Sequence, residues 1–260
     1  MPNDPRQPPR PRDDWALFLD VDGTLLDIAP RPDAAEVPDG LRESLAAAAA
    51  ALGGALALVS GRAVADIDRL FAPLRLPASG QHGAELRAAA VSAPAAGVML
   101  LPESALDAVG SAVAGMPGVH VEIKTYAAAV HYRAAPEAGE ALRRSLVPVA
   151  AATGLALLPG RLVWELRPFG VSKGTAVGAF MAQAPFRGRR PVFIGDDIAD
   201  EDGFAAARAQ GGLGLRVAGY AGEDWPQPAT PPSFTGPAAV RAWLADLARL
   251  QGSRTAACAT

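Results

Sequence analysis

Short apolar runs, each followed at once by acidic, serine or glycine residues, constrain the fold of this chain more than any other feature. Trp15–Leu19, Ala55–Val59 and Pro191–Ile194 contain no charged side chain. Such runs are typical of strands that are buried on both faces of a parallel sheet. Helical patterns alternate with these runs, which predicts an α/β fold with a doubly wound, Rossmann-like core. The expected helices of this core cover residues 38–52, 64–71, 173–183, 200–209 and 238–250.

The middle of the chain has a different order of elements. Helical patterns at 103–114 and 137–152 each precede two strand patterns, and Pro159-Gly160 predicts a tight turn between the last two strands. This order predicts an α+β layer with one open sheet face, inserted into the core. We expect a disordered tail at 1–14, a core domain at 15–97 and 168–260, and an inserted cap domain at 98–167. The proline-rich residues 222–237 are expected to form a loop.

Composition narrows the class of protein. Half of the 260 residues are apolar and one fifth are charged, so the chain can bury a substantial core. The net charge of −3 disfavours a nucleic-acid-binding protein. The longest uncharged apolar run, Leu45–Val59, is too short to cross a bilayer, and the proline- and arginine-rich N-terminus lacks the apolar core of a signal peptide.

Cysteine usage points to a compartment. The chain has one cysteine, Cys258, so it can form no internal disulfide and fits a reducing environment. We therefore expect a cytoplasmic protein with neither nucleic acid nor membrane as a partner. The sequence supports no prediction of the oligomeric state.

Two acidic clusters follow predicted strands. Asp20 and Asp22 lie two residues apart just after the first strand, where their carboxylates would share a face and repel each other. A hard cation such as Mg²⁺ would relieve that repulsion, and Gly23 allows a sharp turn. Residues 195–202, which include Asp196, form the second acidic cluster after the strand at 191–194. A polar turn without a metal is the alternative interpretation of either cluster alone.

Two further clusters suit an anion. Ser60 and Gly61 follow the second predicted strand and open a helix, where a hydroxyl and backbone N–H groups can bind an anion. A serine that caps a helix is the alternative. Lys173 falls in the first turn of a predicted helix, where the helix dipole disfavours a cation, so we expect an anion to hold it. A surface lysine is the alternative.

All four clusters are expected at the same edge of the predicted sheet. The carboxyl ends of parallel strands meet at one sheet edge, which is where ligands bind in open α/β sheets. Carboxylates for a hard cation, a hydroxyl and a lysine at one edge together require an anionic substrate with oxygen atoms. The residues therefore favour a phosphate-bearing substrate.

These motifs resemble those of a known superfamily. Asp20–Thr24, Ser60, Lys173 and Gly195–Asp197 are similar, in this order, to the four motifs of the haloacid-dehalogenase superfamily of phosphohydrolases. Within it the chain resembles the trehalose-6-phosphate phosphatases from about Trp15 to Leu250, and the likeness fades at 222–237. The supporting strings are Leu25–Pro30, Gly80–Arg87, Val121–Lys124, Val130–Arg133, Glu165–Pro168 and Gly195–Asp202.

The resemblance implies a mechanism and site residues. Asp20 would be the nucleophile that forms an aspartyl-phosphate, and Asp22 would be the acid and then the base. Mg²⁺ would be held by the Asp20 carboxylate, the Asp22 backbone carbonyl and Asp196. Ser60, Gly61 and Lys173 would bind the transferring phosphoryl group. Asp197 and Asp200 would support this site. The reaction implied is hydrolysis of trehalose 6-phosphate, the last step of trehalose biosynthesis.

The strings that fall in the expected cap domain point to sugar-binding residues. The chain has 22 arginines and only two lysines, Lys124 and Lys173, so lysine at position 124 is a candidate geometric requirement. The other candidates that could bind the sugar are Arg62, Glu85, Glu122, His131 and Glu165. For each of these, an ordinary polar residue of a strand or loop is the alternative.

Two other activities stay open at this point. A phosphatase for a different sugar phosphate would use the same site, and a phosphosugar mutase would share the aspartyl-phosphate but pass it to a second sugar. A non-catalytic binding module is disfavoured, because a binder has no need of Asp20 beside Asp22.

Overall fold

The computed structural model describes residues 8–29, 34–88, 93–95, 98, 100–160, 162–219 and 229–257. The chain divides into two compact units, of which the first contains Met1–Ala93 and Ser172–Thr260 and the second contains Pro94–Val171. The second unit is thus an insertion between two halves of the first. The expected cap boundaries at 98 and 167 lie four residues inside these limits.

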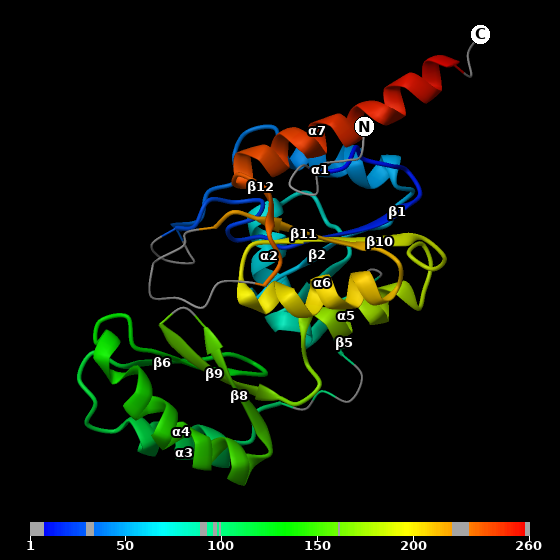
Figure 1. Ribbon diagram of the computed structural model, residues 1–260. Coiled ribbons are helices and arrows are strands. Elements are labelled where there is room, and N and C mark those ends of the chain that lie inside the picture. Colours follow the sequence, from blue (N-terminus) through cyan, green and yellow to red (C-terminus); the bar gives the residue numbers. More distant parts are fainter. Residues whose placement is uncertain are drawn as a thin grey trace. The chain divides into compact units, whose positions relative to one another are not determined.

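A single mixed sheet forms the centre of the first unit (Figure 1). Its strands run in the order β12-β11-β10-β1-β2-β3-β4-β5, and the neighbours from β12 to β3 pair in parallel. The strands are β1 (Trp15–Leu19), β2 (Leu56–Val59), β3 (Ala78–Gly80), β4 (Glu85–Arg87), β5 (Ala93–Pro94), β10 (Arg190–Gly195), β11 (Leu213–Val217) and β12 (Pro232–Phe234). All residues of β1 and β2 are buried, as expected for central parallel strands.

Helices cover both faces of this sheet. In Figure 1, α1 and α7 pack together on one face, and α5 and α6 pack together on the other. Trp15 stacks on Trp243 of α7, and Phe18 stacks on Phe186, so residues from β1 hold both layers. The helices are α1 (Leu41–Ala51), α2 (Val64–Phe71), α5 (Lys173–Met181), α6 (Glu201–Ala209) and α7 (Pro237–Ala257).

The order of the strands places the predicted clusters together. From β1 the chain builds the sheet outward through β2 on one side, and it later adds β10 and β11 on the other side. Such a reversal of strand order leaves a crevice at the carboxyl ends of the strands beside it. Asp20 follows β1, Ser60 follows β2 and Asp196 follows β10. All three residues therefore lie at the carboxyl ends of these strands, where a ligand is expected to bind.

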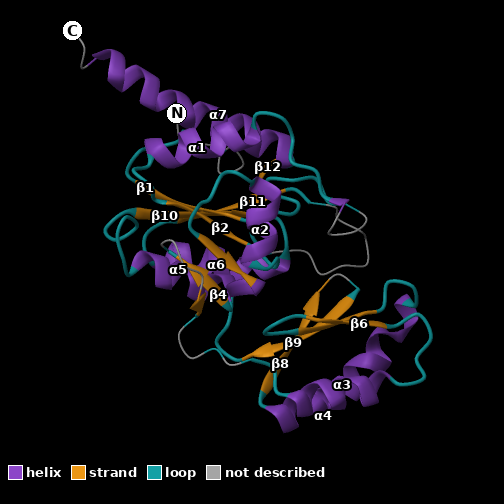
Figure 2. Ribbon diagram, turned by 180° about the vertical axis from the view of Figure 1, so that it is seen from behind, coloured by secondary structure: helices purple, strands orange, loops and turns teal. Residues whose placement is uncertain are grey.

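The second unit is a four-stranded antiparallel sheet with two helices on one face (Figure 2). Its strand order is β6-β7-β9-β8. Val130 and Leu166 of the sheet are fully buried against Leu142 and Leu146 of the helix α4. The elements are α3 (Glu103–Val113), β6 (His120–Ile123), β7 (Ala128–His131), α4 (Gly139–Thr153), β8 (Leu155–Gly160) and β9 (Val163–Pro168).

The structure confirms the predicted fold class and corrects one expectation. Residues 222–237 are not a loop throughout, because Pro232–Phe234 form β12 at the sheet edge. Phe234 is buried and meets Trp243 edge-on, and this tertiary contact outweighs a local sequence that begins with proline. The stretch at 222–228 lies outside the described residues. Among the helices that the structure describes, none is long and apolar enough to span a membrane.

Candidate active site

Asp20 lies at the bottom of the crevice and is almost fully buried. Its backbone N–H donates to the Ile194 carbonyl of β10, which continues the sheet by one residue beyond β1. Its Oδ1 lies 2.9 Å from Nζ of Lys173. The first carboxylate of the Asp20–Thr24 motif is therefore directly paired with the first residue of α5.

Asp200 is the second partner of Lys173. Its Oδ1 accepts a hydrogen bond of 2.6 Å from Lys173 Nζ, and the side chain of Asp200 is fully buried. Its Oδ2 accepts from the backbone N–H groups of Asp196 and Asp197, at 3.0 and 2.9 Å. Both oxygens are thus in use, so Asp200 anchors the lysine and the turn after β10 and is not the best candidate for a metal ligand.

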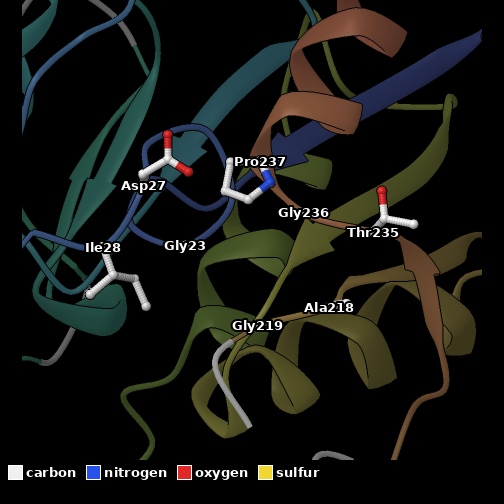
Figure 3. Close-up of a pocket in the computed structure, with 8 residues that line it drawn as sticks. All are labelled: Gly23, Asp27, Ile28, Ala218, Gly219, Thr235, Gly236 and Pro237. Carbon is white, nitrogen blue, oxygen red and sulfur yellow. The ribbon is translucent and has the colours of Figure 1, made fainter.

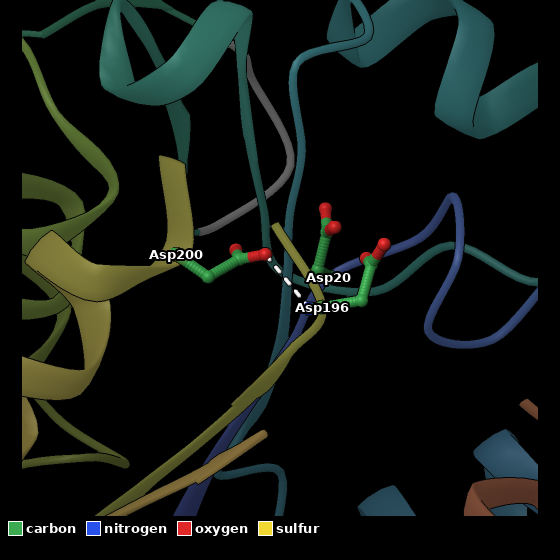
Figure 4. Close-up of side chains that lie close together, drawn as sticks. All are labelled: Asp20, Asp196 and Asp200. Carbon is green, nitrogen blue, oxygen red and sulfur yellow. Dashed lines mark hydrogen bonds between the residues drawn. The ribbon is translucent and has the colours of Figure 1, made fainter. Parts of the chain in front are cut away.

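Carboxylates from two strand ends and one helix start gather at this point (Figure 4). Oxygen atoms of Asp20, Asp196 and Asp200 all lie within 4.8 Å of one another. Burial, together with the negative charge of Asp200, raises the pKa of Asp20 well above its usual range. The same two causes raise the pKa of Asp196 to about 7. One lysine does not balance three acidic groups, so the donor set fits a hard cation with oxygen ligands.

The hydrogen bonds decide which oxygens could hold that cation. Thr24 donates to Asp196 Oδ1 at 3.1 Å, which leaves Asp196 Oδ2 for a metal. Asp20 has one oxygen paired with Lys173, and its other oxygen is the second candidate. Gly23 packs so closely on Asp196 that an added Cβ would lie 2.2 Å from Oδ2, so only glycine fits there. Asp20 and Asp196 therefore fit the predicted metal site.

Lys173 occupies the place that its sequence position predicted. Ser172 caps α5 through its side chain, with Thr175 completing the capping box, so Lys173 is the first helical residue. Burial acts to lower the pKa of Lys173, but the charges of Asp20 and Asp200 outweigh it and raise the pKa. The anions that hold this lysine against the helix dipole are thus two carboxylates of the protein itself.

The Asp22 side chain lies apart from the carboxylate cluster. Arg62 Nε donates to Asp22 Oδ2 and Arg62 NH2 donates to Asp22 Oδ1, both at 2.6 Å. This bidentate geometry is the strongest form of arginine–carboxylate pairing. Asp22 was expected at the metal through its backbone carbonyl, and Arg62 was expected on the sugar. The structure brings these two side chains together, and this pair leaves the Asp22 backbone carbonyl available.

The loop after β2 carries Ser60 and Gly61. Ser60 is buried, and its Oγ accepts from the Arg62 backbone N–H at 3.2 Å. Gly61 faces the imidazole of His82, because an added Cβ would lie 2.6 Å from Nε2. This close packing favours glycine at position 61, where the absence of a side chain also lets an anion approach the backbone N–H.

Glu85 has a different environment from the one expected of a sugar ligand. Its Oε2 accepts from the Val64 backbone N–H and its Oε1 accepts from Gln81 Nε2, each at 2.6 Å. Both oxygens are used within the first unit, beneath the start of α2.

The four candidates of the second unit gather on one face of its sheet. Glu122, His131 and Glu165 alternate with the buried residues of their strands, so they lie on the face opposite α3 and α4. Lys124 Nζ lies 3.2 Å from Glu165 Oε1. His131 Nε2 lies 2.9 Å from Glu122 Oε2, and this hydrogen bond is the main cause that lowers the pKa of Glu122. We call Glu122, Lys124, His131 and Glu165 the cap cluster.

Sequence reasoning missed two members of these sites. Arg167 is largely buried and lies 3.8 Å from Glu165 on the same sheet face. The spacing of two between Glu165 and Arg167 in a strand could have revealed it. Thr24, which donates to Asp196, stood inside a motif that was recognised but received no role of its own.

A pocket of about 300 Å³ adjoins the carboxylate cluster (Figure 3). Gly23 and Gly219 belong to its wall and also pack on Asp196, and Gly236 and Pro237 contribute the start of α7. Among the described residues that line the pocket, the two that pack on Asp196, Gly23 and Gly219, are both glycines.

Comparison with known proteins agrees with this geometry. The trehalose-phosphatase family model matches residues 18–230. The trehalose-6-phosphate phosphatase of Escherichia coli (strain K12) is 40% identical over 208 residues, which cover 78% of this chain and 77% of that protein. A probable trehalose-phosphate phosphatase of Sinorhizobium fredii is 43% identical over 207 residues, which cover 79% of this chain and 78% of that protein.

Solved structures support the fold. A trehalose-6-phosphate phosphatase related protein superposes with a TM-score of 0.70 and 24% identity, covering 92% of this chain and 99% of that one. The C-terminal domain of the Candida albicans trehalose-6-phosphate phosphatase gives a TM-score of 0.72 and 20% identity, covering 90% and 92%. The family match and the two relatives at 40% and 43% identity show that the chain belongs to the trehalose-phosphatase family.

Proposed function

We propose that this protein is a Mg²⁺-dependent phosphatase that hydrolyses trehalose 6-phosphate to trehalose and phosphate, the last step of trehalose biosynthesis. The observation that carries the proposal is the buried Asp20 carboxylate, paired with Lys173 at 2.9 Å and grouped with Asp196. The family match and the two relatives support the choice of substrate. The single cysteine supports a reducing, cytoplasmic compartment.

Asp20 and Asp196 would hold Mg²⁺, with the Asp22 backbone carbonyl as a third ligand. When bound, the ion would supply positive charge that offsets these carboxylates and the phosphoryl oxygens. Burial, and after it the charge of Asp200, raises the pKa of both Asp20 and Asp196, and a bound cation would offset both effects.

In the first half of the reaction, an oxygen of Asp20 attacks phosphorus in line with the leaving sugar oxygen. The new O–P bond forms an aspartyl-phosphate as the bond from phosphorus to the sugar oxygen breaks. Asp22 donates its proton to that sugar oxygen, which leaves as trehalose. Lys173, the Ser60 hydroxyl and the Gly61 backbone N–H bind the phosphoryl oxygens and stabilise their charge.

In the second half, water attacks the phosphorus of the aspartyl-phosphate. Asp22 takes a proton from this water, the bond between phosphorus and Asp20 breaks, and phosphate leaves. Asp20 is then ionised again, and Asp22 holds the proton that it gives to the next leaving sugar oxygen. Arg62, which pairs with ionised Asp22 at 2.6 Å, would stabilise the form of Asp22 that acts as base.

The cap cluster would bind the sugar. Lys124, Glu122, Glu165 and His131 offer both donors and acceptors on one sheet face, which suits the many hydroxyl groups of a disaccharide. Side chains that already pair with one another are held in fixed rotamers, and such preorganisation lowers the entropic cost of binding.

The test is phosphate release from a panel of sugar phosphates, with and without Mg²⁺. We expect trehalose 6-phosphate to give the highest kcat/KM, and we expect a chelator to abolish turnover. A higher kcat/KM for sucrose or mannosylglycerate phosphates would overturn the substrate assignment. A requirement for a sugar bisphosphate activator, with transfer in place of release, would identify a mutase. Asp20→Asn supplies the background rate.

A further inference from the structure

The loop that carries Ser60 and Arg62 is hydrogen-bonded to the segment Ser79–Glu85. Ser60 N–H donates to the Ser79 carbonyl at 2.9 Å, and His82 N–H donates to the Ser60 carbonyl at 3.0 Å. Gln81 N–H donates to the Arg62 carbonyl at 2.9 Å. The backbone on both sides of Gly61 therefore takes its position from this segment.

The same segment adopts an unusual backbone. Gln81, His82 and Gly83 have φ angles of 46°, 57° and 114°. Non-glycine residues rarely adopt this left-handed region, and they keep it only where the surrounding structure requires it. An added Cβ on Gly83 would lie 2.3 Å from the Ser172 carbonyl oxygen, so the turn also packs against the residue before Lys173.

Glu85 ties this turn to the loop above it. The helix α2 begins at Val64, and its N-cap residue, Ala63, has no side chain that could accept a hydrogen bond. Glu85 Oε2 accepts from the Val64 N–H, one of the first helical N–H groups that have no partner within the helix, while Oε1 accepts from the Gln81 side chain. Val64 follows Arg62 by two residues, and Gln81 holds the Arg62 carbonyl. Glu85 thus restrains the backbone of Arg62 from two directions.

We infer that Glu85 is a positioning residue that acts through Arg62: it fixes the loop so that the guanidinium meets both oxygens of Asp22. A bidentate pair tolerates little displacement. Both 2.6 Å hydrogen bonds form only when the guanidinium of Arg62 is coplanar with the carboxylate of Asp22 and faces its two oxygens. The inference rests on the proposed function, in which Asp22 serves the leaving sugar oxygen and the water. It assigns Glu85 no contact with substrate.

Substitutions separate this role from a sugar contact. Glu85→Ala leaves the Val64 N–H and the Gln81 side chain without their acceptor, so we expect kcat to fall about 10-fold. Turnover of phenyl phosphate, which has no sugar, should also fall, because Asp22 also activates the water that hydrolyses the aspartyl-phosphate. Glu85→Gln should restore most of it, because the amide oxygen can accept from Val64 and the amide nitrogen can donate to a turned Gln81 amide. A carboxylate that bound the sugar would show a loss confined to trehalose 6-phosphate.

Asp68→Ala is the matched control. Asp68 lies on α2 and pairs with Arg87 of β4, so it joins the same two elements as Glu85 without touching the loop. Both alanine variants should lower Tm, but only Glu85→Ala should lower kcat at a temperature where both proteins are folded. In an Arg62→Ala background, Glu85→Ala should cost less than about 2-fold, because residues that act through one another are not additive.

The position of the Arg62 Nε–H signal in NMR spectra provides a readout that needs no turnover. Glu85→Ala should move this signal away from its hydrogen-bonded position, and Asp68→Ala should leave it in place. The inference is overturned by an unmoved signal, by a kcat loss confined to trehalose 6-phosphate, or by full additivity with Arg62→Ala. A wild-type protein that cleaves phenyl phosphate but not trehalose 6-phosphate would refute only the proposed substrate.

Discussion

Lys173 Nζ lies 2.6 Å from Oδ1 of Asp200 and 2.9 Å from Oδ1 of Asp20. One lysine thus links the proposed nucleophile after β1 to the start of α6, and all three side chains are buried. Because the other oxygen of Asp200 holds the turn that contains Asp196, this carboxylate organises both the lysine and a metal-ligand candidate. The resemblance to known phosphohydrolases predicts only a supporting role for Asp200.

Asp200→Asn tests that organising role. The amide has one oxygen in place of two. Its N–H₂ group therefore faces either Lys173 or the Asp196 N–H, and the contact with that donor is lost. We expect a loss of about 3 kcal/mol in the free energy of unfolding, typical of a buried pair with one partner removed. Denaturant titration measures this change, and exposed Asp202→Asn is the control. An unchanged midpoint for Asp200→Asn would contradict the role.

Asp20→Asn should abolish turnover and leave the fold intact. An amide is a poor nucleophile and a weaker ligand for Mg²⁺, while its shape matches that of the carboxylate. Phosphate release and circular dichroism measure the two expectations. Mass spectrometry must exclude deamidation of the sample, because a small fraction of restored aspartate would mimic activity. Substantial turnover by a verified Asp20→Asn sample would exclude Asp20 as the nucleophile.

Asp196→Ala should raise the Mg²⁺ concentration needed for half-maximal activity far more than Asp202→Ala does. Asp196 follows β10 directly and lies in the carboxylate cluster, whereas Asp202 is exposed on α6. A Mg²⁺ titration of activity for each variant measures the difference. Equal shifts for both variants would argue against a localised metal site.

Stabilisation by Mg²⁺ should depend on pH. The pKa of Asp196 rises from 3.8 to about 7 in the folded, metal-free protein. The folded state therefore holds this proton more tightly than the unfolded state, and the metal-free protein loses stability as pH rises from about 4 to about 7. Mg²⁺ binds the ionised carboxylate, so it should raise Tm more at pH 8 than at pH 5. Asp196→Asn should remove most of this difference, and an equal Mg²⁺ effect on Tm at both pH values would contradict the assignment.

Lys124→Ala should lower kcat/KM for trehalose 6-phosphate by about 10- to 100-fold, or roughly 1.4–2.7 kcal/mol. The value for phenyl phosphate should fall much less, because that ester has no sugar for Lys124 to bind. Lys124→Arg should also be impaired, since the larger planar group does not match the 3.2 Å contact with Glu165. Lys173→Ala should lower kcat/KM for both substrates to a similar extent, because both carry the phosphoryl group that Lys173 binds.

Arg144→Ala supplies the control for Lys124. Arg144 belongs to the same unit, is exposed, and forms a long ion pair of 3.8 Å with exposed Glu140. Its removal should leave the ratio of the two kcat/KM values as in the wild type. An unchanged ratio in Lys124→Ala as well would end the proposed specificity role.

Much of the fold could be predicted because burial and chain order carry it. The uncharged runs at Trp15–Leu19 and Pro191–Ile194 are compatible only with strands covered on both faces, and the helical patterns between the strands require crossovers. Parallel strands end at the same edge, so the side chains after them had to be neighbours. That argument placed Asp20 and Asp196 together, and the structure does so. The edge strand β12 escaped it because three residues beginning with proline carry too little pattern.

The sequence by itself therefore determined the class of fold, the sheet edge at which the chemistry gathers and the residue types available there. Only the tertiary structure decided which side chain pairs with which: Arg62 with Asp22, Lys173 with Asp200, and Glu85 with Val64 and Gln81. The physical reason is that hydrogen-bond partners depend on distances of a few tenths of an ångström between segments that can be 172 residues apart in the chain. No local periodicity encodes such distances, because they result from the packing of the whole core.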